Sequence, residues 1–244
     1  MTTTDVTPTE PSSAAGGAGR PLDVAFLVFE SMTALDFVGP WDTIAIGAKV
    51  SRRPVRLHLV SADPGPVTCD SGLQVVPTAT LEQVRRCDVL VVPGTGRPSR
   101  PMSDSRLVDW LRATHPHATW TMSVCTGALL LAQAGLLRGR AATTSWQYLD
   151  DLAAFGALPR DKRWVRDGNV LTSAGVSAGI DAAHVLVEAL WGESTVASTQ
   201  AVLEYDPAPP FDYGSIDKLP PEAASALRAV FETERDAVRR LASR

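Results

Sequence analysis

The sequence is poor in cysteine, with three in 244 residues, at positions 69, 87 and 125. An odd number of cysteines, without the spacing of a disulfide framework, argues against a secreted domain held together by disulfides. It favours a reducing compartment, which we expect to be the cytoplasm. The three cysteines and four histidines match no zinc-ligand spacing. We therefore expect neither a metal centre nor a bound cofactor.

Positive charge and long apolar runs are also scarce. Lysine and arginine number 23 against 27 acidic residues, a net charge of −4. Such a chain offers no broad basic field for phosphate backbones, so we expect no nucleic-acid partner. No stretch approaches the roughly 20 uninterrupted apolar residues of a membrane span, so we expect no membrane partner either. A small-molecule substrate fits this composition better.

The chain nevertheless has enough apolar residues to fold, because 45% of it is hydrophobic and 20% is charged. Residues 1–20 are rich in Thr, Ser, Pro and Gly and read as a disordered tail. No linker with a change of composition interrupts the remainder. We expect residues 21–244 to form one domain that ends in a helix.

Short apolar runs alternate with longer amphipathic segments, which is typical of a mostly parallel sheet covered by helices on both faces. The sequence thus predicts a three-layer α/β sandwich. The expected strands are 22–29, 55–60, 88–94 and 118–124, the expected hairpins are 67–77 and 164–175, and the expected helices are 33–48, 104–114, 126–135, 177–192, 193–205 and 221–243.

Cys125 lies where a predicted strand meets a predicted helix without a loop. In parallel sheets ligands gather at the carboxyl ends of strands. A sharp turn exposes such a cysteine, and the N–H groups and dipole of the helix favour its thiolate, so we expect a lowered pKa. Gly127 would permit the close packing that this elbow needs. The alternative is a buried small hydrophobic residue.

The other cysteines and the histidines fit structural roles better. Cys69 lies in a predicted hairpin and Cys87 just before a strand, so neither begins a helix. His184 shares an apolar helical stripe, which favours a core or interface histidine. His115 and His117 fall in a connection, where a solvated loop is expected. A Cys-His-Glu triad with its last two members two residues apart is absent.

Asp36 follows the first predicted strand and so belongs to the same sheet edge as Cys125. It is either a first-turn acid favoured by the helix dipole or a catalytic group. The turns PGTG (93–96) and SAG (173–175) lack the spacing of phosphate loops. Their backbone N–H groups could instead form an anion hole.

Several segments bear a family resemblance. SVCTGALLLAQAGLLRGRAATTSW (123–146) resembles the nucleophile region of the ThiJ/PfpI superfamily and, more narrowly, of its isocyanide (isonitrile) hydratases. FESMTALDFVGPWD (29–42), RDGNVLTSAGVSAGID (166–181) and LEYDPAPPFDYGS (203–215) are similar to other segments of that group. The resemblance spans about residues 22–219 and implies a flavodoxin-like, class I glutamine amidotransferase-like fold.

The resemblance implies roles for single residues. Cys125 would be the nucleophile and Asp36 its acid and base, while Thr126 and Val176 would supply backbone N–H groups. Substrate contacts are then expected from Gly94, Thr95, Gly175, Val176 and Trp146. The chain departs from the family at Ser145, where members usually carry histidine, and at Thr95, where they carry glycine.

The implied reaction suits these residues, because an isocyanide carbon is electrophilic and a thiolate is a soft nucleophile. Cys125 would form a thioimidate, and water would then release a formamide. A thiol and a carboxyl group in contact should hold one proton between them. The family also implies a homodimer, although the terminal helix could cover either a partner or its own sheet.

Other classes within the superfamily remain as alternatives. They are glyoxalase- or deglycase-like enzymes, which use a glutamate in place of Asp36, and stress proteins whose cysteine senses oxidants. A third is the ligand-sensing half of a transcription regulator. The residues after Pro220 suffice for one helix and are too few for a helix-turn-helix module.

Overall fold

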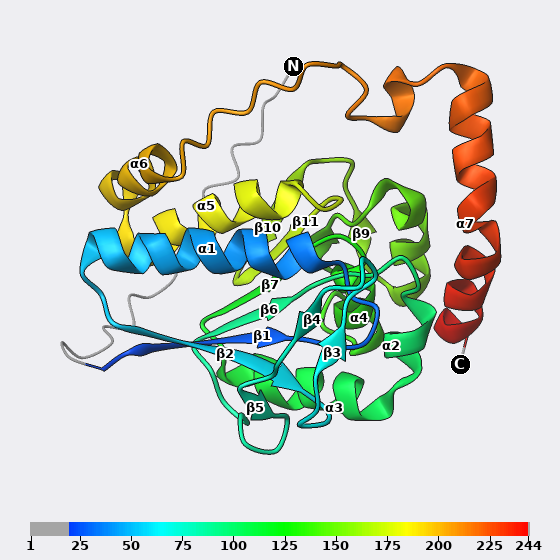
Figure 1. Ribbon diagram of the computed structural model, residues 1–244. Coiled ribbons are helices and arrows are strands. Elements are labelled where there is room, and N and C mark those ends of the chain that lie inside the picture. The colour runs from blue at the N-terminus through cyan, green and yellow to red at the C-terminus, as the bar shows by residue number, and fades with distance from the viewer. Residues whose placement is uncertain (1–19, 244) are drawn as a thin grey trace, which may run out of the picture.

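The computed structural model describes residues 20–243 (Figure 1). The tail predicted over residues 1–20 therefore lies, except for Arg20, outside the described residues. Within the described part, none of the helices combines the length and apolar composition needed to cross a bilayer.

A seven-stranded sheet forms the middle layer, in the order β10-β11-β7-β6-β1-β2-β5. All neighbouring strands are parallel except the β10–β11 pair. The predicted mostly parallel sheet is therefore confirmed. The strands are β1 (Leu22–Leu27), β2 (Val55–Ser61), β5 (Ala79–Thr80), β6 (Val89–Val92), β7 (Trp120–Ser123), β10 (Trp164–Asp167) and β11 (Val170–Ser173).

Helices cover both faces of this sheet, as predicted (Figure 1). On one face α1 (Ala34–Ser51) and α5 (Ala178–Trp191) pack together, with α6 (Glu193–Val202) against both. On the other face lie α2 (Ser99–Ser103), α3 (Ser105–Thr114) and α4 (Gly127–Gln133). Because both faces are covered, the four residues of β6 and the four of β7 are all buried.

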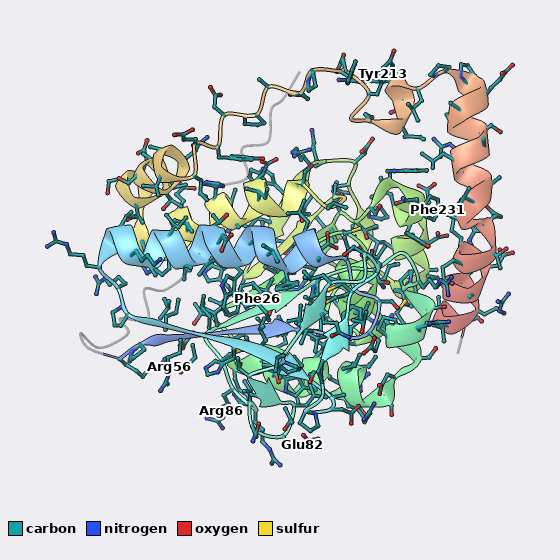
Figure 2. All side chains as sticks on the ribbon, in the orientation of Figure 1. Phe26, Arg56, Glu82, Arg86, Tyr213 and Phe231 are labelled. Carbon is teal, nitrogen blue, oxygen red and sulfur yellow. The ribbon has the colours of Figure 1, made fainter. Side chains whose placement is uncertain are left out.

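Close packing at the α1–α5 contact depends on small residues in α1. A Cβ atom on Gly47 would lie 2.9 Å from the Trp191 ring, and one on Gly39 would lie 2.9 Å from Ile180. On the side of α1 that faces the sheet, the Trp41 ring packs on Phe26 of β1 at a centroid distance of 5.1 Å (Figure 2). The helix that carries Asp36 is thus fixed from two sides.

Both predicted hairpins are present. β3 (Val67–Thr68) and β4 (Gln74–Val75) form a separate two-stranded sheet. β10 and β11 are joined at Gly168, whose φ of 60° lies in the left-handed region. Glycine adopts this conformation without the steric cost that other residues bear.

Residues 136–163 contain structure that the sequence analysis did not predict. β8 (Ala141–Ala142) and β9 (Leu158–Pro159) pair there, and the 3-10 helices η2 (Trp146–Tyr148) and η3 (Asp150–Phe155) lie between them. A third 3-10 helix, η1 (His115–His117), replaces the predicted loop. These elements are too short to show a hydrophobic period.

The last helix, α7 (Pro221–Ala242), packs against α2, η2 and η3 of its own chain. Asp151 of η3 accepts hydrogen bonds from Arg235 at 3.1 Å and Arg239 at 2.7 Å. Glu234 accepts one from the Ser99 N–H at 2.8 Å. The sequence left open whether the terminal helix covers a partner or its own sheet. In the structure α7 packs on its own chain, but it contacts these short helices and not the sheet.

We expect Asp151→Ala to loosen α7, because the Asp151 side chain is only 5% exposed and binds two guanidinium groups. Hydrogen bonds to charged groups contribute about 1.5–3 kcal/mol each at most, so unfolding should become easier by roughly 1–3 kcal/mol. Urea unfolding and the rate of proteolysis within α7 measure this. Glu232→Ala is the control, because Glu232 pairs with the same arginines but is 53% exposed. Equal effects of the two substitutions would contradict the prediction.

Candidate active site

Four parallel strands end at one edge of the sheet and bring four chain segments together there. The segments are 28–36 after β1, 93–96 after β6, 124–126 after β7 and 174–177 after β11. Carboxyl ends of neighbouring parallel strands always share an edge, and ligands bind there in this class of fold. The topology alone thus places the predicted site residues, except Trp146, within one region.

Cys125 occupies the elbow between β7 and α4 that the sequence predicts. Its φ of 55° is in the left-handed region, which is unusual for a residue with a side chain. The backbone is held on both sides: the Cys125 N–H donates to the Ala174 carbonyl at 3.1 Å, and its carbonyl accepts from Thr144 Oγ1 at 2.8 Å. The neighbouring strand and the 143–145 segment therefore fix the strained turn.

Two glycines allow the neighbouring turn to approach this elbow. A Cβ atom on Gly127 would lie 2.2 Å from the Val92 carbonyl oxygen, which no side chain could tolerate. One on Gly94 would lie 2.6 Å from the Thr126 nitrogen and 3.0 Å from Asp36 Oδ2. The carboxyl group of Asp36 and the start of α4 therefore meet across the space that Gly94 leaves open.

Asp36 lies in the first turn of α1 and is fully buried. Its side chain does not cap its own helix, because Oδ2 accepts a hydrogen bond from the Gly94 N–H at 2.8 Å. Oδ1 is buried and has no hydrogen-bond partner among the described residues. Burial raises the pKa of this carboxyl group to about 7, with a smaller contribution from Asp70 and an opposing one from the Gly94 N–H.

The expected low pKa of Cys125 is wrong for this structure. The side chain is only 8% exposed, and burial, together with the nearby Asp36, raises the pKa of the thiol to about 12. The N–H groups of Val176 and Thr126 and the Ser145 hydroxyl hydrogen-bond to the thiol and act in the opposite direction. Desolvation exceeds their combined effect, so at neutral pH Cys125 is a thiol beside a partly ionised carboxyl group.

Thr126 and Thr95 join the elbow to the turn at Gly94. Thr126 Oγ1 accepts from the Thr95 N–H and donates to the Thr95 carbonyl, both at 2.8 Å. The side chain of Thr95 points the other way, because its hydroxyl donates to the Ser31 carbonyl at 2.6 Å. The residue that replaces the family's glycine is thus directed to the 28–33 loop.

Ser145, Gly175 and Val176 line the other side of the thiol. The buried Ser145 hydroxyl contacts both the Cys125 thiol and Gln147 Oε1. A Cβ atom on Gly175 would lie 3.7 Å from Ser145 Oγ. Val176 has a φ of 30°, a genuine outlier for a β-branched residue, and its N–H is directed at the thiol.

Trp146 lies farther out than the other predicted site residues. Its half-buried ring packs edge-on against Phe231 of α7 at a centroid distance of 6.0 Å, and the Arg228 guanidinium lies 5.4 Å from the ring centre. Figure 2 shows Phe231 on the face of α7 that meets the body of the molecule. Trp146 therefore connects the Ser145 segment to the terminal helix.

Tyr148 is a residue of this region that the sequence analysis missed. Its hydroxyl is buried and has no hydrogen-bond partner among the described residues. Burial raises the pKa of this phenol, and the charges of Glu234 and Cys125 add to the shift. No periodic pattern surrounds Tyr148, because it lies in a 3-10 helix of three residues.

None of the four histidines lies near Cys125. His184 is buried in α5, contacts the Ile180 carbonyl through Nδ1 at 2.9 Å and stacks on Tyr205, so the predicted core histidine is confirmed. His58 Nε2 lies 3.3 Å from Asp23 Oδ1, at the start of β1. His115 contacts Thr121 and His117 is exposed. Among the described residues, Asp36 is the ionisable partner of the thiol.

We expect Asp36→Asn to stabilise the fold above neutral pH. The folded pKa of about 7 exceeds the usual 3.8, so the carboxyl group binds its proton more tightly when folded, and stability is lost as pH rises from 3.8 to 7. A neutral amide avoids this loss, on the order of 4 kcal/mol. Thermal unfolding from pH 4 to 8 should show a variant advantage that grows up to about pH 7 and then levels off. A constant advantage would contradict the assigned pKa.

The chain is similar in sequence to a known protein family and to characterised proteins. The DJ-1/PfpI family model matches residues 23–189. An isonitrile hydratase from Pseudomonas putida is 44% identical over 207 residues, covering 85% of this chain and 89% of that protein. The transcriptional regulator CdhR of Pseudomonas aeruginosa is 32% identical over 65% of this chain but is matched over only 48% of its own length.

Solved structures agree with the sequence matches. The crystal structure of a ThiJ/PfpI family protein from Pseudomonas syringae superposes with a TM-score of 0.86 at 33% identity, covering 97% of each chain. Drosophila melanogaster DJ-1beta shares the fold at a TM-score of 0.67 and 22% identity, over 76% of this chain and 98% of its own. The family match extends over all four segments that form the site. The chain belongs to the DJ-1/PfpI family.

Proposed function

We propose that this protein is an enzyme that hydrates an isonitrile to the N-substituted formamide, with Cys125 as nucleophile and Asp36 as acid and base. The observation that carries the proposal is the buried carboxyl group of Asp36, which has a pKa of about 7 and an unpartnered oxygen beside a thiol on a strained elbow. The 44% identity to the isonitrile hydratase of Pseudomonas putida supports this choice of substrate class.

The first step forms the covalent intermediate. The ionised Asp36 takes the thiol proton as Cys125 Sγ attacks the terminal carbon of R–N≡C, so a thiolate never has to exist free in the buried site. Asp36 then returns the proton to that carbon. The product is a thioimidate, R–N=CH–S–Cys125, and the carboxyl group is ionised again.

The second step uses water. Asp36 removes a proton from water as the oxygen adds to the thioimidate carbon, and the carbon–sulfur bond breaks to release the thiol of Cys125. The proton passes through Asp36 to the departing sulfur, while the second proton of the water reaches nitrogen. The sum is R–N≡C plus water giving R–NH–CHO, with both side chains restored.

The hydrogen-bond donors around Cys125 suit a reaction in which negative charge develops on sulfur. The N–H groups of Thr126 and Val176 and the Ser145 hydroxyl are directed at sulfur and stabilise negative charge whenever it develops there. Gly94, Thr95 and Gly175 form the adjoining backbone, and Trp146 closes the outer side. We propose Gly94, Thr95, Gly175, Val176 and Trp146 as the substrate pocket, with no metal or cofactor in the chemistry.

A second candidate is a ligand-sensing domain, which the 32% identity to the regulator CdhR favours. Two other family activities fit less well. An oxidant sensor needs an accessible thiolate, whereas the Cys125 thiol is nearly closed to solvent and its pKa is raised. A glyoxalase- or deglycase-like reaction would be expected with glutamate in place of Asp36.

We further propose that residues 21–244 act as one domain, in a cytoplasmic homodimer. Buried apolar side chains from Val24 to Val238 belong to one cluster, which supports the single domain. Phe211 and Tyr213, on the segment between α6 and α7, are 73% and 62% exposed and offer apolar area to a second copy. Figure 2 shows Tyr213 on this outer segment. Free cysteines fit a reducing compartment.

The decisive test is release of the formamide from a set of alkyl and aryl isonitriles by the purified protein. Wild type should turn over, and Cys125→Ala should be inactive while remaining folded. Mass spectrometry of the protein with a bulky isonitrile should find the adduct on Cys125. An adduct on Cys69 with Cys125 unmodified, or turnover by the alanine variant, would reject the mechanism. Binding without turnover would favour the sensor.

Asp36→Asn should lower kcat by about 10²–10⁴-fold with little change in substrate affinity, because the amide keeps the shape but cannot carry a proton. In wild type, kcat/KM should rise with pH through about 7 as the carboxyl group ionises. The variant should lose this limb. Steady-state kinetics from pH 5 to 9 measure both effects, and an unchanged kcat would reduce Asp36 to a structural residue.

Ser145 should affect substrate preference more than rate, since the mechanism needs only Cys125, Asp36 and backbone donors. Ser145→His places the family's usual side chain in a space that a small residue now fills, so bulky isonitriles should lose more kcat/KM than small ones. Ser145→Ala is the control, which removes the hydroxyl contacts with the thiol and with Gln147 but adds no bulk. A uniform gain of orders of magnitude with histidine would show that a missing base limits the native protein.

A further inference from the structure

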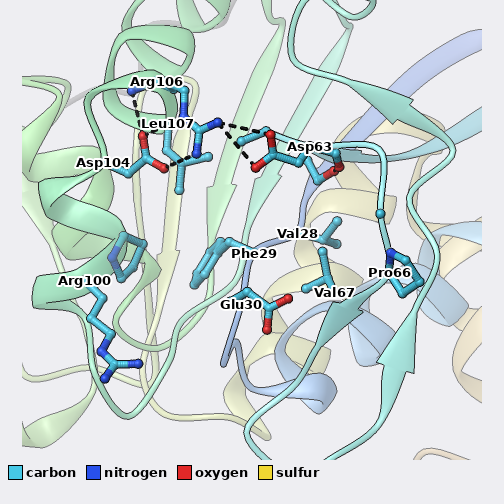
Figure 3. Close-up of a pocket in the computed structure, with 14 residues that line it drawn as sticks. Val28, Phe29, Glu30, Asp63, Pro66, Val67, Arg100, Asp104, Arg106 and Leu107 are labelled. Atoms are coloured by element: carbon cyan, nitrogen blue, oxygen red, sulfur yellow. Dashed lines mark hydrogen bonds and ion pairs between the residues drawn. The ribbon is translucent and has the colours of Figure 1, made fainter.

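A cavity of about 270 Å³ lies on the same edge of the sheet but outside the candidate active site. It opens between the ends of β1 and β2, the loop that leads to β3, and helices α2 and α3 (Figure 3). None of the proposed catalytic or substrate-contacting residues lines it. Its lining residues are Val28, Phe29, Glu30, Ser61, Ala62, Asp63, Gly65, Pro66, Val67, Arg100, Pro101, Asp104, Arg106 and Leu107.

Three of the five charged side chains in the lining pair with one another and together carry a net charge of −1. Arg106 lies between two carboxylates, 2.9 Å from Asp104 Oδ2 and 3.2 Å from Asp63 Oδ1. Figure 3 shows this group along one border of the lining. The arginine is bridged on both sides and is therefore not available to hold an anion.

The other two charges are free to bind a ligand. Within residues 20–243, Arg100 forms no ion pair or hydrogen bond through its guanidinium, which is exposed to solvent. The Glu30 carboxylate accepts only long hydrogen bonds of 3.3 Å from the Thr68 N–H in that part of the chain. In Figure 3 both lie on the border opposite Arg106, and the Phe29 ring lies among the lining side chains.

Apolar side chains make up part of the lining, with Leu107 beside Arg106 and Val28 beside Val67 (Figure 3). Val28 is fully buried, Phe29 is 7% exposed and Leu107 is 3% exposed, so they form a rigid surface and not a flexible rim. A ligand with only a carboxylate would be attracted by Arg100 but repelled by Glu30. A ligand with only an ammonium group would be attracted by Glu30 but repelled by Arg100. A molecule with both charges and a short apolar group satisfies both side chains, and the volume suits a small metabolite rather than a nucleotide.

We propose that this cavity is a second binding site, which takes an α-amino acid with an apolar side chain. The carboxylate pairs with Arg100, the ammonium group pairs with Glu30, and the side chain packs on Phe29 and Leu107. Arginine suits this role because its planar guanidinium binds a carboxylate through two hydrogen bonds.

The position of the site gives it access to the catalytic loops. Residues 28–30 line the cavity, and the carbonyl of the next residue, Ser31, accepts from Thr95 Oγ1 at 2.6 Å. Two residues later the Thr33 N–H donates to the Gly94 carbonyl at 2.9 Å. The ligand thus binds behind the turn that holds Asp36, which suits a regulator of the site and not its substrate.

Calorimetric titration of the full chain with L-leucine tests the proposal. We expect saturable binding of one molecule per chain. Leucinamide, which lacks the carboxylate, and 4-methylpentanoate, which lacks the ammonium group, should each bind at least tenfold more weakly. No saturable binding of leucine or phenylalanine, or equal binding of the one-charge analogues, would overturn the proposal.

Variants locate the binding. Arg100→Gln and Glu30→Gln should each weaken leucine binding at least tenfold, with unfolding temperatures close to that of wild type. Arg86→Gln, at an exposed arginine away from the cavity (Figure 2), should leave binding unchanged. Cys125→Ser should also leave it unchanged, because the thiol does not line this cavity. If only Cys125→Ser lost leucine binding, the ligand would bind in the active site and the proposal would be overturned. The formamide-release assay tests the hydratase function independently of leucine binding.

Discussion

The contact between the turn at Gly94 and the first residues of α4 is the constraint on which the rest of the site depends. Gly94 and Gly127 have no side chains, and the segments around them pack so closely that a Cβ atom would lie 2.6 Å from the Thr126 nitrogen at Gly94 and 2.2 Å from the Val92 carbonyl oxygen at Gly127. The Gly94 N–H then orients Asp36, and Thr126 clamps the backbone of the next residue. Moving any of these segments by one side-chain width would separate the carboxyl group from the thiol.

This packing also explains why the pKa values of the Asp36 carboxyl group and the Cys125 thiol are both raised. A carboxyl group with one backbone donor and one unpartnered oxygen is poorly solvated, and the thiol beside it is nearly sealed. Burial therefore raises the pKa of both groups, to about 7 for the Asp36 carboxyl group and to about 12 for the Cys125 thiol. The protein holds a destabilising carboxyl group in its interior, as is common at sites whose function needs a shifted pKa.

The sequence predicted the sheet, the covering helices and the elbow, because buried strands such as 88–94 are continuous apolar runs and helices such as 177–192 are long enough to show a helical period. It also placed Asp36 and Cys125 at one sheet edge, which follows from the parallel topology. It failed for the pKa of Cys125, because helix-start electrostatics can be read from a pattern but burial by segments distant in sequence cannot. Tyr148 and the short helices of residues 136–163 were missed because no local repeat marks them.

The link between α6 and α7 sets how securely the last helix is held. The connecting residues run along the outside of the molecule and include the 3-10 helix η4 (Ile216–Lys218) (Figure 1). A flexible chain of that length has an r.m.s. span of roughly 25 Å. Because the link keeps α7 at such a distance, the effective concentration of α7 near Asp151, which binds its arginines, is in the millimolar range. At micromolar protein concentrations a helix that detaches therefore returns to its own chain far more often than it exchanges with another, and only crowded or concentrated protein would favour swapped assemblies.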